Sequence, residues 1–318
     1  SIFDNIKHID DSLILWRSST QWIGGLYFLF SVILLIDFFD DNLKKTLTNY
    51  LSFNTTEIFR QSLKIFIFYS FLTLVIFIIL NLFDFRSFIS LNLSMTLISS
   101  GGFLPINNLS SILNSQLKII ILSLLMLFSF FSLFFSYNLF TFKRKGSKII
   151  QEDIYLIVYF IIILFSFFAL VDKDVNFSII FLAITSSISN IGISLDSAPE
   201  NLSIIFLLLI IIGGSFFSTS SGLRFIKIYS LFKYSINQIL SFSRPKNIFM
   251  NKLIFTKINF DFYEINKYFL TILIFIISLF ILASLLSLSG MEFENSFKLS
   301  ILTLMNTVNS SIYGLSEI

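Results

Sequence analysis

The hydrophobic positions of this chain form long apolar runs that alternate with much shorter ones. A membrane-spanning helix needs about 20 apolar residues, whereas runs of about 10 to 14 are typical of re-entrant or buried helices. Five runs predict membrane spans, namely Leu13–Ile36, Leu63–Phe83, Leu117–Phe142, Ile154–Val171 and Phe269–Ser289. Three runs predict re-entrant helices, namely Phe88–Ile98, Phe177–Ser189 and Phe297–Asn309. The pattern therefore predicts an all-α membrane protein.

The short runs lead into small polar residues and a glycine, so that the chain contains an internal repeat. The glycines are Gly102, Gly192 and Gly314. A span, a short helix, a glycine turn and a second span make one repeat unit. We assign residues 1–40 to the end of a first repeat, 41–150 to a second, 151–260 to a third and 261–318 to the start of a fourth. Because the first and last units are incomplete and Ser1 is not Met, we expect a fragment.

The second span of the third repeat, Leu202–Leu240, is interrupted. Its apolar run Ile204–Ile212 breaks at Gly213-Gly214, passes through a Ser/Thr-rich stretch to Gly222, and resumes near Arg224 and Lys227. Hydrocarbon cannot satisfy freed backbone groups, so such a break faces protein or a water-filled path. A loop, a membrane helix and a Gly/Ser-rich tail are the alternative interpretation, since glycine is common in membrane helices.

Composition and charge support a membrane protein and narrow its chemistry. Of the 318 residues, 55% are hydrophobic and only 13% charged, against about 25% in soluble proteins. The chain has no Cys and a single His, His8, which excludes thiolate sites and disfavours His-based metal or catalytic sites. Basic residues gather in loops such as Lys143–Lys148, whereas acidic residues flank the short runs. The positive-inside rule then places the basic loops in the cytoplasm and the glycine turns outside.

The predicted spans offer few ionisable groups. The runs Ile65–Phe83, Ile119–Phe142, Ile154–Val171 and Phe269–Ser289 contain no Asp, Glu, His, Lys or Arg. Proton-coupled carriers and voltage sensors depend on such groups, and a membrane-embedded enzyme would find only hydroxyls. The chain is therefore predicted not to be an enzyme.

Backbone carbonyls remain as the chemistry available at membrane depth. Rings of carbonyls can replace the hydration shell of an alkali cation, and glycine permits the backbone angles that such a row requires. Each glycine alone is equally typical of an ordinary turn. Their recurrence predicts ion-binding segments at Ser99, Ser100, Gly101 and Gly102, at Ser189, Asn190, Ile191 and Gly192, and at Ile312, Tyr313 and Gly314.

Several segments resemble the Trk/Ktr/HKT superfamily of potassium transporters, in particular the TrkH-type membrane subunit. The segment Leu13–Gly25, with its Trp-Arg and Gln-Trp-x-Gly-Gly motifs, is similar to the start of a span in that family. Ile98–Phe103, Ser189–Ser194 and Ile312–Ser316 resemble its second, third and fourth selectivity filters. Gly213–Lys227 resembles its intramembrane gating loop.

The resemblance implies repeated span–pore helix–span units around a pseudo-fourfold pore, as in potassium channels. It implies potassium uptake across the bacterial inner membrane, with K⁺ bound at the filter residues and no covalent cofactor. It also implies a homodimer and a cytosolic nucleotide-binding regulatory subunit. Sodium permeation and ion-coupled secondary transport are the alternatives.

The gating loop implied by the resemblance comprises Gly213, Gly214, Ser218, Thr219, Gly222, Arg224 and Lys227. Arg224 and Lys227 have a second interpretation beside a gating role, as basic residues that anchor the chain on the cytoplasmic side of the membrane. Phe217 and Ser221 stand where the family usually has glycines, and Tyr313 where Thr or Val is usual. These departures bear on loop flexibility and on the preference between K⁺ and Na⁺.

Overall fold

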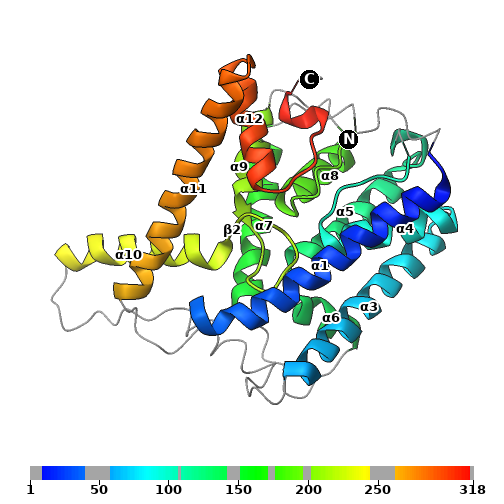
Figure 1. The fold of residues 1–318 in the computed structure, drawn as a ribbon, viewed down its shortest axis with the longest axis horizontal. Helices are drawn as coiled ribbons and strands as arrows, with labels where there is room; N and C mark the ends of the chain where they lie inside the picture. The colour runs from blue at the N-terminus through cyan, green and yellow to red at the C-terminus, as the bar shows by residue number, and fades with distance from the viewer. Residues whose placement is uncertain are drawn as a thin grey trace.

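The chain folds into a bundle of helices, which the computed structural model describes for residues 9–39, 58–106, 109–141, 151–170, 176–195, 202–243 and 262–315 (Figure 1). The long helices are α1 (Asp11–Phe39), α3 (Ile58–Leu82), α7 (Gln151–Leu170) and α11 (Phe262–Leu288). Three of them contain segments that are long and apolar enough to cross a membrane, Phe59–Leu82, Glu152–Ala169 and Ile265–Leu288. The prediction of an all-α membrane protein is confirmed.

The three short apolar runs form short helices. They are α4 (Ser87–Ser99), α8 (Phe177–Ile188) and α12 (Phe293–Leu304). Between α3 and α4 the chain turns back at Asp84, and between α11 and α12 at Gly290, both with positive φ. Helix α4 packs against α1 and α3, while α12 packs along α11 (Figure 1). Helices α4 and α12 are thus each supported by longer helices.

The predicted third span is not one continuous helix, which corrects the sequence interpretation of Leu117–Phe142. It divides into α5 (Gln116–Phe130) and α6 (Leu133–Thr141). The break at Phe131 and Ser132 is stabilised because its backbone groups find partners in another segment: the N–H of Leu133 donates to the carbonyl of Phe217 over 2.9 Å.

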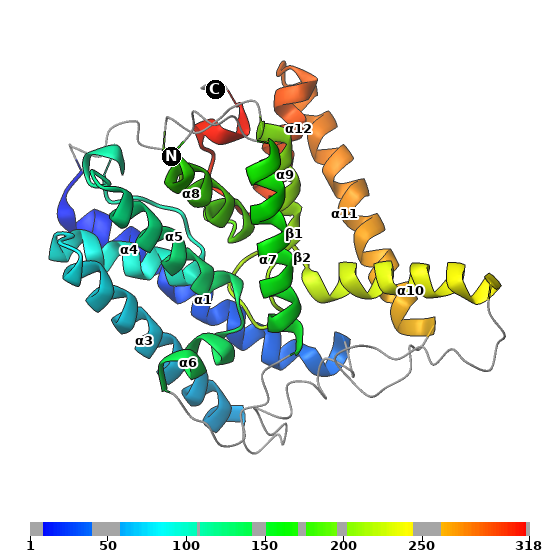
Figure 2. The same ribbon diagram turned by 180° about the vertical axis from the view of Figure 1, so that it is seen from behind.

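The predicted broken span is indeed interrupted. Helix α9 (Ser203–Ile211) leads into the two-residue strand β1 (Ile212–Gly213), and β2 (Leu223–Arg224) leads into α10 (Phe225–Ser243). The strands pair in parallel, with Ile212 opposite Leu223 and Gly213 opposite Arg224. Helix α10 runs crosswise to α7 and α9 in both views, so that it does not continue the direction of α9 (Figures 1 and 2). Two short 3₁₀ turns complete the described elements, η3 (Leu109–Ser111) and η6 (Ser311–Tyr313).

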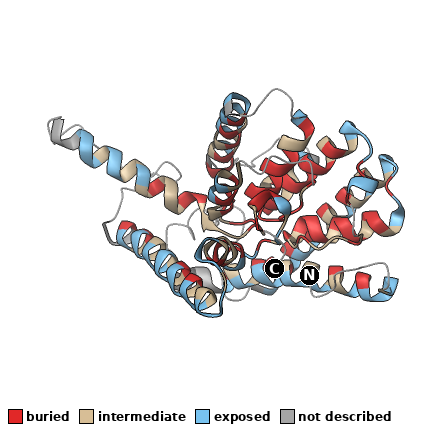
Figure 3. Cartoon of the chain, turned by 90° about the horizontal axis from the view of Figure 1, so that it is seen from above, coloured by how far each residue is buried: buried red, intermediate tan, exposed pale blue. Residues whose placement is uncertain are grey.

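The hydrophobic core has two parts. One joins α1, α3, α4 and α5 through residues such as Leu29, Leu72 and Leu93, and the other joins α7, α8, α9 and α12 through Phe167, Phe206 and Ile301. Buried residues concentrate at the centre, while the outer helices carry many exposed apolar side chains (Figure 3). Such an apolar exterior is expected where hydrocarbon is the solvent.

Some sequence predictions fall outside the described residues. The boundaries between the assigned repeats, at residues 40, 150 and 260, are among them, and so is the basic cluster Lys143–Lys148. The repeat boundaries and the cytoplasmic placement of the basic loops stay predictions.

Candidate cation pathway

The C-terminal ends of the three short helices share one backbone geometry. Each helix is followed by a residue with left-handed angles, at Ser100, Asn190 and Asn306, whose φ values are 57°, 59° and 50°. The next residue in each case donates its N–H to a carbonyl five residues earlier: Gly101 to Thr96, Ile191 to Ser186 and Thr307 to Leu302, over 2.9, 3.1 and 2.9 Å. These bonds satisfy carbonyls that a helix end leaves without a partner.

Two predicted filter glycines lie in buried segments that contact each other. Gly102 and Gly192 have φ values of 75° and 78°, which side chains with a β-carbon rarely adopt. A β-carbon on Gly102 would collide with the carbonyl of Ile191, and one on Gly192 would collide with the backbone of Val308. Glycine is required at both positions because the chain segments that follow the three short helices approach one another there.

Serines link the second and third predicted filter segments. The Ser100 hydroxyl donates to the carbonyl of Ser189. The hydroxyls of Ser99 and Ser189 instead donate back into their own helices, to Met95 and Thr185 over 2.8 and 2.7 Å. The Asn190 amide donates to the carbonyl of Ile210 over 2.9 Å, which ties this segment to α9.

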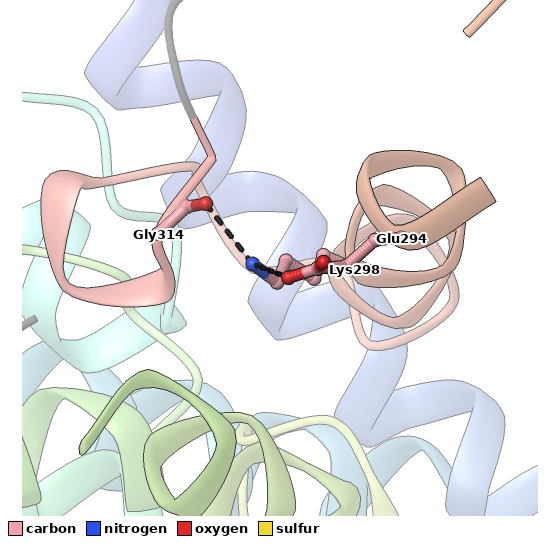
Figure 4. A network of polar contacts seen from close by, with 3 residues as sticks. All are labelled: Glu294, Lys298 and Gly314. Carbon is pink, nitrogen blue, oxygen red and sulfur yellow. Dashed lines mark hydrogen bonds and ion pairs between the residues drawn. The ribbon is translucent and has the colours of Figure 1, made fainter. Parts of the chain in front are cut away.

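The predicted fourth segment lies elsewhere. Gly314 caps η6, and its carbonyl accepts a hydrogen bond of 3.2 Å from Lys298, which is also paired with Glu294 over 2.7 Å (Figure 4). The side chains of Ile312 and Tyr313 are fully buried. The structure thus brings Gly102 and Gly192 together but places Gly314 beside Lys298 and Ser203.

Helix α1 holds the predicted second filter segment from the side. The Gln21 amide donates to the carbonyl of Gly101 over 2.8 Å, and Thr96 donates to the Gln21 oxygen over 3.1 Å. Gly25 allows close packing, since a β-carbon there would lie 2.6 Å from the Tyr69 hydroxyl. The Gln-Trp-x-Gly-Gly motif singled out in the sequence therefore has a positioning role that sequence reasoning did not assign.

The predicted gating loop lies against the break between α5 and α6. The N–H groups of Ser215 and Ser220 donate to the carbonyls of Phe130 and Ser129, each over 3.0 Å. The loop also reaches the ends of two short helices: the hydroxyl of Thr219 donates to Ile98 over 2.7 Å, and that of Ser221 donates to Met305. Broken backbone in this segment is satisfied by protein, as its interruption predicts.

Arg224 holds the loop from within. Its Nη1 donates to the carbonyls of Ser215 and Ser220 over 3.1 and 2.8 Å, and to the hydroxyl of Ser218 over 3.1 Å. Gly214 and Ser220 close the loop, because the N–H of Gly214 donates to the Ser220 hydroxyl over 3.0 Å. The close packing of Gly213 against Gly222 completes it. Lys227 follows on α10 and is half-buried.

Two buried carboxylates at the start of α7 were missed by the sequence analysis. Glu152 accepts hydrogen bonds from the hydroxyl of Ser215 and the N–H of Phe216, each over 3.0 Å. Asp153 accepts hydrogen bonds from the N–H and the hydroxyl of Ser132, over 3.0 and 2.7 Å. They lie in the first turn of α7, whereas the span predicted from hydropathy begins only at Ile154. The signal available in the sequence was a pair of acidic residues directly before an apolar run.

A cavity of about 620 Å³ lies between the helix ends and the loop. Its lining comes from α1, from the ends of α4 and α12, and from the loop, and includes Gln21, Ser99, Gly101, Thr219, Ser220, Ser221, Asn306, Thr307 and Val308. The C-terminal ends of helices carry partial negative charge and favour cations. Among the described residues no group of three or more His, Cys, Asp or Glu could hold a metal ion. The polar side chains that line this cavity carry hydroxyl and amide groups.

No protein-family model matches the chain, and no curated protein matches it. A solved structure does, the crystal structure of the potassium transporter TrkH from Vibrio parahaemolyticus, with a TM-score of 0.78 and 16% sequence identity. The chain adopts the TrkH fold. The match covers 95% of this chain and 64% of the Vibrio chain, so the resemblance noted in the sequence extends to nearly the whole chain.

Proposed function

We propose that this chain forms a pathway for monovalent cations and that the ion it takes up is K⁺. The observation that carries the proposal is the meeting of helix ends from three repeats above a cavity lined by backbone, hydroxyl and amide groups. Carbonyl oxygens and helix C-terminal ends stabilise an alkali cation without a fixed charge. The TrkH fold supports the same class of function, because its Vibrio representative is a potassium transporter.

In this proposal the loop Gly213–Gly222 obstructs the pathway. Thr219, Ser220 and Ser221 line the cavity from one side, whereas Gly101 and Val308 line it from the filter side. An ion that leaves the filter segments would meet the loop next. Conduction therefore requires the loop to move, and Arg224 and Glu152 are placed to resist that movement.

The wider assignments follow from the same proposal. The protein would lie in the bacterial inner membrane with its filter side outward, as a homodimer controlled by a cytosolic nucleotide-binding subunit. It would need no covalent cofactor, and it would not be an enzyme. Sodium permeation is the second candidate, favoured by the non-glycine residue Val308 beside Gly102 and Gly192.

The test is a transport assay in a bacterium that lacks its own K⁺ uptake systems. The protein is expressed from its gene, and growth at low external K⁺ and Rb⁺ uptake are measured. We expect rescue and Rb⁺ uptake that are lost on Gly192→Asp with the variant present in the membrane. Rescue that survives Gly192→Asp would contradict the filter assignment, whereas Na⁺ uptake without rescue would favour the second candidate.

A further inference from the structure

The shared geometry of the three helix ends allows their residues to be matched one by one. The left-handed residues Ser100, Asn190 and Asn306 correspond, and so do the three donors of the bond that spans five residues. Counting one residue further from each donor reaches Gly102, Gly192 and Val308. The residue that corresponds to the filter glycines is therefore a valine.

Contacts agree with this count. A β-carbon on Gly102 would lie 2.7 Å from Cγ2 of Val308, and one on Gly192 would lie 2.8 Å from the backbone nitrogen of Val308. Asn306, Thr307 and Val308 also line the cavity together with Gly101. Val308 thus touches both predicted filter glycines and also belongs to the lining of the cavity.

Residues Ile312–Gly314 have a different role in the structure. The carbonyl of Gly314 accepts the hydrogen bond from Lys298, whose ammonium group is held by Glu294 (Figure 4). Ile312 and Tyr313 are packed into the second part of the core. A carbonyl that already binds an ammonium group is poorly suited to coordinate a passing cation, because the two positive charges repel each other.

We propose that Asn306–Val308, rather than Ile312–Gly314, supply the fourth repeat's part of the cation pathway, and that Val308 determines ion selectivity. The inference rests on the proposed function. A β-branched residue avoids the positive φ that Gly102 and Gly192 adopt, so the Val308 carbonyl is oriented differently from theirs. Discrimination between K⁺ and Na⁺ depends on the number and field strength of coordinating carbonyls. Val308 consequently weakens the discrimination that a glycine would permit.

The first experiment compares Val308→Gly with Gly314→Ala in the transporting protein, by uptake of Rb⁺ and Na⁺ in competition. We expect Val308→Gly to raise the preference for Rb⁺ over Na⁺ by about tenfold, which corresponds to ~1.4 kcal/mol. Gly314→Ala should alter at most the amount of protein in the membrane. An unchanged preference in a Val308→Gly protein that still transports would overturn the inference, and so would a shift confined to Gly314→Ala.

A second experiment does not depend on transport. Because the chain has no Cys, Val308→Cys and Ile312→Cys each carry a single thiol. Ag⁺ binds thiolates as a monovalent cation, and its reaction with each variant is measured by mass in membrane vesicles. We expect the thiol of Val308→Cys to react, with K⁺ slowing the reaction, and the thiol of Ile312→Cys to stay unmodified.

The opposite order of reactivity would overturn the assignment of Val308 to the pathway. The two proposals fail in distinguishable ways. If the unaltered protein takes up neither Rb⁺ nor Na⁺, the proposed function is wrong, whereas the Ag⁺ reaction still reports which segment borders the cavity.

Discussion

The Oε1 atom of Glu152 accepts a hydrogen bond of 3.0 Å from the backbone N–H of Phe216. The first turn of a membrane-spanning helix is thereby attached to the middle of the proposed gating loop. Only 3% of the Glu152 residue surface is exposed, so water competes little for this bond. The second carboxylate oxygen accepts the hydroxyl of Ser215, and the carboxylate therefore holds two consecutive loop residues.

We predict that Glu152→Gln loosens the loop. The amide keeps one acceptor oxygen but replaces the second acceptor by an N–H group, and a buried hydrogen-bonding group left without its partner costs about 1–3 kcal/mol. The variant should unfold at lower temperature in detergent. It should also take up Rb⁺ faster under conditions in which the unaltered protein takes up little Rb⁺. Thermal unfolding and initial Rb⁺ uptake rates provide the measurement.

Glu292→Gln is the matched control for this prediction, because it removes one carboxylate charge at an exposed position. It should leave both the unfolding temperature and the uptake rate unchanged. Equal behaviour of the two variants would show that charge alone, rather than the contacts with Ser215 and Phe216, accounts for the effect of Glu152→Gln.

Arg224→Lys separates the two interpretations of Arg224. The change keeps the positive charge that a membrane anchor needs, but a lysine ammonium cannot reproduce the planar fork by which arginine reaches several acceptors. We predict that Arg224→Lys raises Rb⁺ uptake under conditions in which the unaltered protein takes up little, because the carbonyls of Ser215 and Ser220 lose their shared donor. Lys227→Arg, which preserves charge on α10, should behave as the unaltered protein. Rb⁺ uptake as low in Arg224→Lys as in the unaltered protein would favour the interpretation of Arg224 as a membrane anchor.

The repeat of long and short helices could be predicted from hydropathy alone. Spans such as Leu63–Phe83 differ by a few residues from the helices that form, since an apolar run of that length has few alternatives in a membrane. The break at Ser132 could not be predicted in this way. Its partners Asp153 and Phe217 lie far along the chain, and no local pattern records a hydrogen bond between distant segments.

The predicted fourth filter segment shows the same limit. A glycine followed by an apolar residue directed attention to Gly314, but the helix end lies several residues earlier, at Leu304. Once the φ of Asn306 and the bond from Thr307 to Leu302 are known, Val308 is the residue in register with Gly192. Valine at this place carries no turn signal, so a search for glycines passes over it.

The ion pair between Glu294 and Lys298 predicts that the stability of the fold depends on pH. The hydrogen bond and charge of Lys298 hold the pKa of Glu294 below its ordinary value of 4.5. A lowered pKa in the folded protein means that the ionised carboxylate stabilises the fold above the ordinary pKa, and that this contribution is lost as pH falls through the folded pKa. The unfolding temperature of the unaltered protein should therefore fall toward that of Glu294→Gln in acid. If the unfolding temperatures of the two proteins differed by the same amount at every pH, the prediction would be contradicted.

Gly192→Ala tests the packing of the filter segments with the smallest possible change. The added methyl group would collide with the backbone of Val308, and φ at this position is 78°, so the substitution is strained in both respects. Gly24→Ala is the matched control. Gly24 also lines the cavity, but a β-carbon there meets no described atom within 4 Å, and alanine favours a helix by about 1 kcal/mol. We predict that Gly192→Ala abolishes Rb⁺ uptake while Gly24→Ala retains it, at equal protein levels in the membrane. Retained uptake with unchanged selectivity in Gly192→Ala would mean that the ion does not pass where the backbones of Gly102, Gly192 and Val308 meet.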